Sequence, residues 1–233
     1  MKISVAMAVY NGEKYVMEQL ESILKQLDND DEICVSVDPS TDDSYRMLVK
    51  FSEKEPRVKV GMGLGAGIKK NFEQAIKMCT GDIIFLSDQD DVWKEDKVIK
   101  VLECFADQSA LLVLHDVSIM NEDLTRTINE SFFAFRECKP GIINNIMKNS
   151  YIGCAMAFRK ELVPYILPIP ETVPMHDQWI GLVAEKKGKV IFLPKQLVKY
   201  RRHGNNNTEL THSNMGNMLK WRTQITAALM KVK

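Results

Sequence analysis

Three carboxylates lie close together near the middle of the chain, at Asp88, Asp90 and Asp91. They follow an apolar run at residues 83–86 that is typical of a buried strand. At the carboxyl end of such a strand, two Asp residues separated by one position suit a hard divalent cation beside phosphate groups. The alternative is a charged turn at a helix start, where Asp is common. We favour a metal site, because three clustered carboxylates repel one another and require a counter-ion.

The composition places the chain among soluble globular proteins. Its 233 residues predict one domain, with room for a small appendage, and 45% hydrophobic with 27% charged residues is ordinary for that class. We find no apolar run of about 18 residues and no signal peptide, so we expect a cytoplasmic protein. The five cysteines are odd in number and lack a C-x-x-C pair. This favours reduced thiols over a disulfide framework or a zinc site.

The net charge of zero hides a basic carboxyl-terminal end. From Lys186 onward there are eleven Lys or Arg residues and one acid, Glu209. Such an end fits nucleic acid, anionic lipid, a phosphorylated ligand, or simply a solvated face. The last segment predicts an amphipathic helix with four large apolar residues on one face, namely Met218, Trp221, Ile225 and Leu229.

Hydrophobic patterns in the first half alternate between strands and helices. We predict strands at 2–9, 33–37, 57–60 and 83–86, and helices at 13–27, about 43–53 and 68–78. Short connections between alternating elements indicate a parallel sheet with helices on both faces. Three polar turns, at 10–13, 38–43 and 87–91, then fall at the carboxyl ends of strands, where ligands bind in such sheets.

The second half is less regular. We predict helices at 97–105, 141–147, 159–166 and 177–186, and strands at 110–114, 154–158, 190–193 and 197–200.

Five short motifs occur in a defined order and together resemble family 2 glycosyltransferases with the GT-A fold, especially their bacterial rhamnosyltransferase-like branch. The motifs are Ala8-Val9-Tyr10-Asn11-Gly12-Glu13, residues 38–43, Ser87-Asp88-Gln89-Asp90-Asp91-Val92-Trp93, His176-Asp177 and Tyr200-Arg201-Arg202-His203-Gly204. The resemblance covers about residues 1–207. It implies an α/β, Rossmann-like and mostly parallel central sheet with a small acceptor-side extension. The nucleotide-sugar half would span about 1–115, the acceptor half about 116–207, and a basic tail 208–233.

The resemblance also implies a reaction: inverting transfer of a sugar from a UDP- or dTDP-sugar to a hydroxyl of a glycan or lipid-linked acceptor. Asp88 and Asp90 match the D-x-D pattern, where Mg²⁺ or Mn²⁺ bridges the donor diphosphate. Asp177 matches the general base that takes the acceptor proton. His203 is expected at the metal or the diphosphate, with Arg201 or Arg202 supplying charge-assisted hydrogen bonds to the diphosphate.

Further roles carried by the resemblance concern the nucleotide and the acceptor. Val9, Asn11 and Glu13 match the first nucleotide-binding loop and Asp38 the second. Asp91 is expected to orient the metal shell or the acceptor. Trp179 is a candidate for stacking on a sugar on the acceptor side, with core packing as the favoured alternative. Lys69 and Asn71 are weaker candidates for contact with the donor.

The second loop departs from the family pattern. It reads Val37-Asp38-Pro39-Ser40, where Asp-Asp-Gly-Ser is common, so an acid near the nucleobase is absent and Pro39 removes a backbone N–H. Asp38 as a mere helix cap is the alternative.

Two rival functions and a question of location remain open. A sugar nucleotidyltransferase requires a basic phosphate-gripping loop near the amino terminus, which residues 9–12 lack. A non-catalytic module that binds sugar nucleotides or glycans is the second rival. For the tail, contact with the inner face of the cell membrane, partner docking and packing on the domain are all compatible with the pattern. We expect a role in cell-surface polysaccharide synthesis and no nucleic-acid partner.

Overall fold

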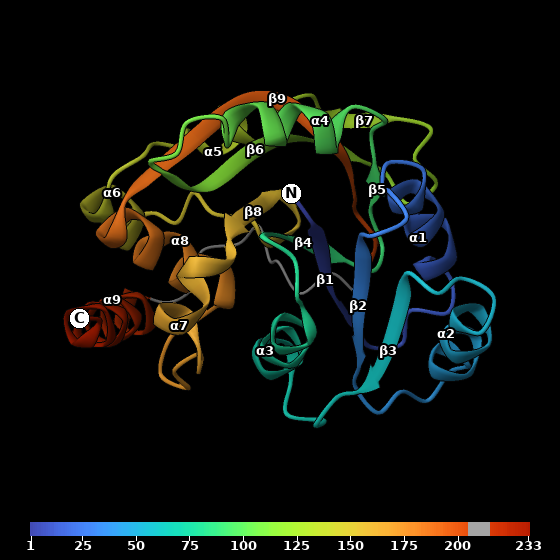
Figure 1. Ribbon diagram of the computed structural model, residues 1–233. Helices are drawn as coiled ribbons and strands as arrows, with labels where there is room; N and C mark the ends of the chain where they lie inside the picture. Colours follow the sequence, from blue (N-terminus) through green and yellow to red (C-terminus); the bar gives the residue numbers. More distant parts are fainter. Residues whose placement is uncertain (205–214) are drawn as a thin grey trace.

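One curved mixed sheet organises the chain (Figure 1). The computed structural model describes residues 1–204 and 215–233, so residues 205–207 of the basic loop and 208–214 of the tail lie outside the described part. Among the described residues, nine strands join this sheet. Its order is β3-β2-β1-β4-β8-β6-β9-β5, and β7 pairs with β6.

The first half forms the parallel part of the sheet. Its strands are β1 (Ile3–Val9), β2 (Glu32–Val37), β3 (Val58–Met62) and β4 (Ile83–Asp88). The neighbouring pairs among them are all parallel, as predicted. The helices α1 (Val16–Leu24) and α2 (Ser44–Ser52) lie on one side, and α3 (Ile68–Met78) lies on the other (Figure 1). Covering both faces explains why β1 and β2 are nearly continuous apolar runs.

The second half adds antiparallel pairs to the sheet. Its strands are β5 (Val92–Trp93), β6 (Ala110–Met120), β7 (Thr127–Asn129), β8 (Met156–Arg159) and β9 (Lys189–Arg201). β8 runs antiparallel to both β4 and β6, whereas β6 and β9 are parallel. The parallel pairing expected from the first half of the sequence therefore holds there, and it recurs between β6 and β9.

β9 corrects a prediction of two strands at 190–193 and 197–200. His115 pairs with Leu193, and the next residue, Asp116, pairs with Gln196. Two residues, Pro194 and Lys195, thus form a bulge, so the proline interrupts the hydrogen-bond ladder without ending the strand. β6 likewise continues to Met120, beyond the predicted end at 114.

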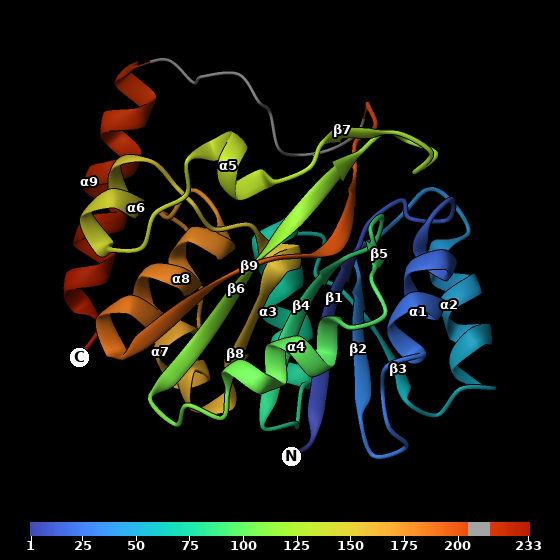
Figure 2. The same ribbon diagram turned by 90° about the horizontal axis from the view of Figure 1, so that it is seen from above.

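Several helices surround this second half (Figure 2). They are α4 (Lys97–Cys104), α5 (Phe132–Arg136), α6 (Ile142–Met147), α7 (Val163–Ile166), α8 (His176–Lys187) and α9 (Met215–Lys231). Two short 3₁₀ turns, η1 (Gly153–Ala155) and η2 (Lys160–Leu162), flank β8. The predicted strand at 154–158 is therefore shorter, because its first residues belong to η1.

The tail helix α9 packs on the domain through part of its apolar stripe. Ile225 is 1% exposed and Leu229 is 6% exposed, whereas Trp221 is 38% exposed. The ammonium group of Lys186 donates to the carbonyl oxygens of Leu229 and Val232. Packing on the domain thus accounts for the carboxyl-terminal half of the stripe. No helix formed by the described residues has an apolar stretch of the length that a bilayer crossing requires.

Candidate active site

A cavity of about 1240 Å³ opens where the parallel strands end. Its walls come from the loops after β1, β2 and β4, from the loop before α3, and from the start of α8 and the end of β9. It contains seven of the residues predicted from the sequence: Val9, Asn11, Asp38, Asp88, Asp90, Asp177 and His203. The convergence of polar loops expected at the carboxyl ends of the strands is therefore present.

The first two loops hold each other in place. Asn11 adopts a positive φ of 48°, which Asn tolerates better than most residues. Its backbone N–H donates to the Ser40 hydroxyl at 3.0 Å, and its side-chain oxygen accepts from the Thr41 N–H at 2.9 Å. The Gly12 N–H donates to the Ser44 hydroxyl at 2.7 Å. These bonds pre-form the rim on which Asn11 and Asp38 lie.

Asp38 lies deeper in the cavity and is 6% exposed. One of its carboxylate oxygens accepts from the Gly65 N–H at 3.0 Å, and α2 begins only at Ser44, after Asp43. The carboxylate therefore ties the second loop to the glycine-rich segment rather than capping α2. Gly63 is required nearby, since a Cβ there would lie 2.3 Å from Oδ1 of Asp38.

Gln89 links the acidic turn to the first loop. Its side chain accepts from the Tyr10 N–H at 2.8 Å and donates to the Tyr10 carbonyl oxygen at 3.0 Å. A Cβ on Gly12 would lie 2.5 Å from Oε1 of Gln89, so only glycine permits this approach. Gln89, the residue between the two acids of the D-x-D pattern, therefore holds the acidic turn against the first loop.

Asp88 and Asp90 face the cavity from the end of β4. Burial, together with the nearby charges of Asp90 and Asp177, raises the pKa of Asp88 to about 7. Oδ2 of Asp90 lies 2.8 Å from Nε2 of His203. Two carboxylates and one imidazole form a donor set that Mg²⁺ or Mn²⁺ accepts, Mn²⁺ more readily because of the nitrogen ligand. The residues present therefore fit the predicted metal.

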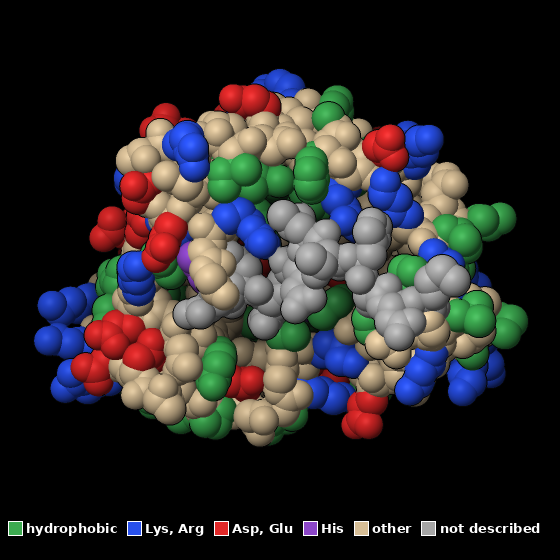
Figure 3. All heavy atoms as spheres, turned by 180° about the vertical axis from the view of Figure 1, so that it is seen from behind, with side chains coloured by type: hydrophobic (Ala, Val, Ile, Leu, Met, Phe, Trp, Pro, Cys, Tyr) green, Lys and Arg blue, Asp and Glu red, His purple; other side chains and the backbone are tan. Residues whose placement is uncertain are grey.

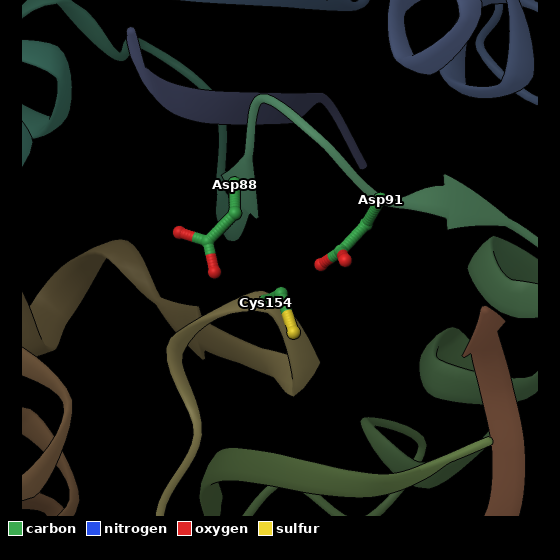
Figure 4. Close-up of side chains that lie close together, drawn as sticks. All are labelled: Asp88, Asp91 and Cys154. Carbon is green, nitrogen blue, oxygen red and sulfur yellow. The ribbon is translucent and has the colours of Figure 1, made fainter. Parts of the chain in front are cut away.

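Asp91 does not lie at the cavity, contrary to its expected place on the acceptor side. It is fully buried, its Oδ1 accepts from the Arg201 N–H, and its side chain points towards Cys154, as does that of Asp88 (Figure 4). Ligand atoms of these three residues lie within 4.8 Å of one another. Burial and the charges of Asp90 and Asp88 raise the pKa of Asp91 well above its usual range.

A buried lysine lies beside this second cluster. Lys97 is fully buried, donates to the Cys154 carbonyl oxygen at 2.8 Å, and holds its ammonium 3.8 Å from the centre of the Trp93 ring. Burial lowers the pKa of Lys97 to about 7, against the opposing charges of Asp91 and Asp88. An internal cation already faces these acids, so we place the metal on the cavity side, at Asp88 and Asp90.

Asp177 lies at the first turn of α8, with its carboxylate at the cavity. Its Oδ1 accepts from the Gln178 N–H at 2.6 Å, and burial raises the pKa of Asp177 to about 7. The preceding residue, His176, is 2% exposed and stacks on Phe72 with ring centres 4.1 Å apart. A carboxyl group with a pKa near neutrality is suited to accept a proton at physiological pH.

The segment before Asp177 is held from the opposite side of the cavity. The ammonium group of Lys69, on α3, donates to the carbonyl oxygens of Glu171 and Val173, each at 2.7 Å. This fixes the proline-rich loop that leads into α8 and so fixes the position of Asp177.

Three other predicted residues are not brought to the cavity wall. Trp179, expected on the acceptor side, is 3% exposed and donates its indole N–H to the Ile166 carbonyl oxygen at 2.9 Å, so it is a core residue. Glu13 braces the first two loops by accepting from the Asp43 N–H. The Arg202 N–H donates to the Met120 carbonyl oxygen, and Arg202 is not among the described residues that line the cavity.

Sequence reasoning missed Tyr15 and Glu122, which line the cavity although neither belongs to a recognisable motif. Asn71, a weaker candidate for contact with the donor, does line the cavity and is 2% exposed. Its amide donates to the Val9 carbonyl oxygen, while its own side-chain oxygen has no hydrogen-bond partner among the described residues. Lys69, the other such candidate, instead bonds to the loop before α8.

Comparison with known proteins decides the family. The sequence profile described as "Glycosyl transferase family 2" matches residues 4–165. The chain belongs to this family. It is 28% identical over 216 residues to an uncharacterized glycosyltransferase of Nostoc sp., alr2836, covering 89% of this chain and 66% of that protein. To the dTDP-rhamnosyl transferase RfbG of Shigella flexneri it is 29% identical over 218 residues, covering 86% and 72%. The chain thus spans about two thirds of these relatives' lengths.

Solved structures of other proteins share its fold. TarS of S. aureus in complex with UDP-GlcNAc has a TM-score of 0.77 at 20% identity, covering 100% of this chain and 68% of that chain. The mannosyltransferase PcManGT of Pyrobaculum calidifontis, in complex with GDP-Man and Mn²⁺, has a TM-score of 0.62 at 18% identity, covering 82% and 54%. The predicted GT-A fold and the predicted family of this chain are both confirmed.

Proposed function

We propose that this family 2 protein is an inverting glycosyltransferase. It transfers a sugar from a UDP- or dTDP-sugar to a hydroxyl of a glycan or lipid-linked acceptor in cell-surface polysaccharide synthesis. The observation that carries the proposal is that one cavity contains the nucleotide loops at Asn11 and Asp38, the acids Asp88 and Asp90, and Asp177 on a different element.

The reaction requires a general base for the acceptor hydroxyl and groups that bind the departing nucleoside diphosphate. Asp177 takes the proton of the acceptor hydroxyl while that oxygen attacks the anomeric carbon from the face opposite the diphosphate. The bond between the anomeric carbon and the diphosphate oxygen breaks, and the nucleoside diphosphate leaves with the electron pair. His203 stabilises the developing negative charge on that group. Because a single displacement occurs, the configuration at the anomeric carbon inverts.

Asp88, Asp90 and His203 are the residues that would hold Mg²⁺ or Mn²⁺. When bound, such an ion supplies Lewis-acid stabilisation of the diphosphate. The turn that carries these acids is fastened to the first loop through Gln89, so the carboxylates are positioned before a donor arrives.

The names of two relatives support the donor and acceptor classes. RfbG is named a dTDP-rhamnosyl transferase, and the Bacillus subtilis relative TuaG, 27% identical over 205 residues, is named a putative teichuronic acid biosynthesis glycosyltransferase. We assign the nucleotide-sugar half to residues 1–115 and the acceptor half to 116–207, with the basic tail at 208–233. β6 runs through the boundary between residues 115 and 116, which supports treating the two halves as one domain.

We further place the protein in the cytoplasm at the inner face of the cell membrane. The outward side of α9 exposes Leu219, Lys220, Met230 and Lys231, a mixture of apolar and basic groups suited to an anionic surface. On the face shown in Figure 3, both acidic and basic side chains are present among the described residues, whereas a nucleic-acid-binding surface is strongly basic.

Vesicle binding tests the location. Lys220→Glu with Lys231→Glu should reduce cosedimentation with phosphatidylglycerol vesicles, whereas Lys25→Glu with Lys54→Glu, at exposed sites on another part of the surface, should not. If both double variants cosedimented with the vesicles to the same extent, α9 would not be the part of the protein that binds the membrane.

Nucleotide release tests the activity. The purified chain is incubated with Mn²⁺, UDP- or dTDP-sugars and candidate acceptors, after a thermal-shift screen has identified the donor that stabilises it. We expect release of nucleoside diphosphate that requires metal and is lost in Asp88→Ala. Release of pyrophosphate would instead indicate a nucleotidyltransferase. A donor that binds but is never turned over would indicate a binding module.

A further inference from the structure

Tyr15 forms an aromatic platform under His203. The two rings are stacked, with centres 5.1 Å apart and planes inclined by 24°. The guanidinium carbon of Arg201 lies 4.6 Å from the centre of the same Tyr15 ring. Tyr15 immediately precedes α1, whereas His203 lies beyond the end of β9, so the contact joins two segments that are far apart in the chain.

The platform is anchored at its far end. The Tyr15 hydroxyl donates to Oε1 of Glu122 at 2.7 Å, and the ammonium group of Lys14 bonds to the same oxygen. Glu122 lies just after β6, on an element separate from both α1 and β9. The phenol is therefore fixed at its ring and at its hydroxyl by different parts of the fold.

His203 needs such a support because strand pairing does not reach it. β9 ends at Arg201, and the imidazole must still direct Nε2 at Oδ2 of Asp90, 2.8 Å away. A nearly parallel ring against one face of the imidazole restricts its rotation to orientations in that plane. The stack thus sets the direction in which Nε2 points.

We infer that Tyr15 is a positioning residue that orients His203 towards the metal and diphosphate site. The inference rests on the proposed function for what His203 contacts, but the orientation itself is a property of the chain without ligand. Removing the ring should let the imidazole turn away from Asp90. Removing the hydroxyl alone should have a smaller effect, because the stack remains.

Two measurements test this role without relying on turnover. The first is calorimetric binding of UDP or dTDP in the presence of Mn²⁺, for the wild type, His203→Ala, Tyr15→Leu and Tyr15→Phe. We expect the dissociation constant to rise roughly 2- to 10-fold in Tyr15→Leu, the range that one aromatic pair supports, and less than about 2-fold in Tyr15→Phe. In the His203→Ala background, Tyr15→Leu should add almost nothing.

The second measurement is the NMR position of the His203 ring protons in the ligand-free protein. Loss of the neighbouring ring in Tyr15→Leu should shift these resonances, while Tyr15→Phe should leave them near their wild-type positions. Tyr45→Leu, on α2 and outside the cavity, is the matched control and should change neither binding nor the His203 signals. If Tyr15→Leu does not fold, Glu122→Ala replaces it, since this half-exposed carboxylate holds the phenol in place.

The outcomes distinguish the positioning role of Tyr15 from the proposed glycosyltransferase function. Unchanged His203 resonances in Tyr15→Leu overturn the positioning role whatever the ligand does. Weaker binding in His203→Ala with wild-type binding in Tyr15→Leu also overturns it. Absence of nucleotide binding in the wild type overturns the proposed function, while the ligand-free resonances still decide whether Tyr15 orients His203.

Discussion

Nε2 of His203 lies 2.8 Å from Oδ2 of Asp90, although 113 positions separate the two residues in the chain. The contact connects the turn after β4 with the segment after β9, which are not neighbours in the sheet order. It closes one side of the cavity and brings an imidazole to the acidic turn. The pair is a direct side-chain link between the two halves of the proposed site.

The first prediction concerns this pair. Asp90→Ala and His203→Ala should each raise the dissociation constant for Mn²⁺ with nucleoside diphosphate by roughly 10- to 100-fold. The double variant should be less affected than the product of the single effects, because each substitution removes part of the same contact. Calorimetry on the four proteins measures the coupling. Fully additive effects would show that the two side chains act independently.

The second prediction concerns the pH dependence of transfer. Burial raises the pKa of Asp177 to about 7, and a general base must be ionised to work. Activity should therefore be low below pH 6 and rise through about pH 7. Asp177→Asn should reduce turnover by roughly 10²- to 10⁴-fold at pH 8 while nucleotide binding stays within a few-fold of wild type. If Asp177→Asn showed the same rise of activity with pH as the wild type, the general base would be another group.

The third prediction is that the ionised Asp177 carboxylate lowers the stability of the folded protein at neutral pH and above. A carboxyl group whose folded-state pKa is raised from 3.8 to about 7 binds its proton more tightly when folded. The folded state therefore loses stability as the pH rises from about 4 to 7. At pH 8, the free energy of unfolding measured in urea should be higher for Asp177→Asn than for the wild type, by on the order of 1 kcal/mol or more. The difference should shrink towards pH 4, and a constant difference would contradict this cause.

The fourth prediction concerns a buried carboxylate remote from the cavity. Glu32, 2% exposed, accepts from the Ser4 hydroxyl at 2.6 Å and the Thr80 N–H at 2.6 Å, and it pairs with Lys59. Burial alone raises its pKa, but the hydrogen bonds from Lys59, Ser4 and Thr80 outweigh burial and lower it to about 2. Its contribution is therefore present above pH 4.5 and lost as the pH falls towards 2.

Glu32→Gln should accordingly lower the free energy of unfolding at pH 7 by about 2 kcal/mol, because one amide oxygen cannot accept all of these bonds. Glu53→Gln, at an exposed position after α2, is the control and should change stability by less than about 0.5 kcal/mol. Urea unfolding at pH 7 and pH 3 measures both. A Glu32→Gln deficit that is equally large at pH 3 and pH 7 would show that charge is not its origin.

Much of the first half was predictable because its signals are local. Hydrophobic periodicity and turn chemistry placed α3 at 68–78 as observed, and the polar turns after the strands at 2–9, 33–37 and 83–86 fall at the cavity. Burial on both faces of a parallel sheet leaves a continuous apolar run in the sequence, so such strands can be recognised without knowing their neighbours. The order of motifs then indicated the family.

The second half was less predictable because pairing across long separations decided it. Nothing near Pro194 indicates that the strand continues beyond it; the partner strand β6 supplies the ladder that resumes at Gln196. The two-residue β5 exists because it pairs with β9, more than 100 positions away. Similarly, the indole of Trp179 is buried and donates its N–H to the Ile166 carbonyl oxygen, so the residue packs in the core although it is close to Asp177 in the sequence.

The sequence alone therefore determined the alternation of elements, the acidic turn at Asp88 and Asp90, and the identity of Asp177 as a candidate base. Tertiary structure decided which acids face the cavity and which are buried, since the Asp91 side chain points towards Cys154 while Asp90 contacts His203. It also decided that Tyr15 supports that histidine. The physical reason is that residue type and local period specify strands and turns, whereas side-chain neighbours depend on how distant strands align in the sheet.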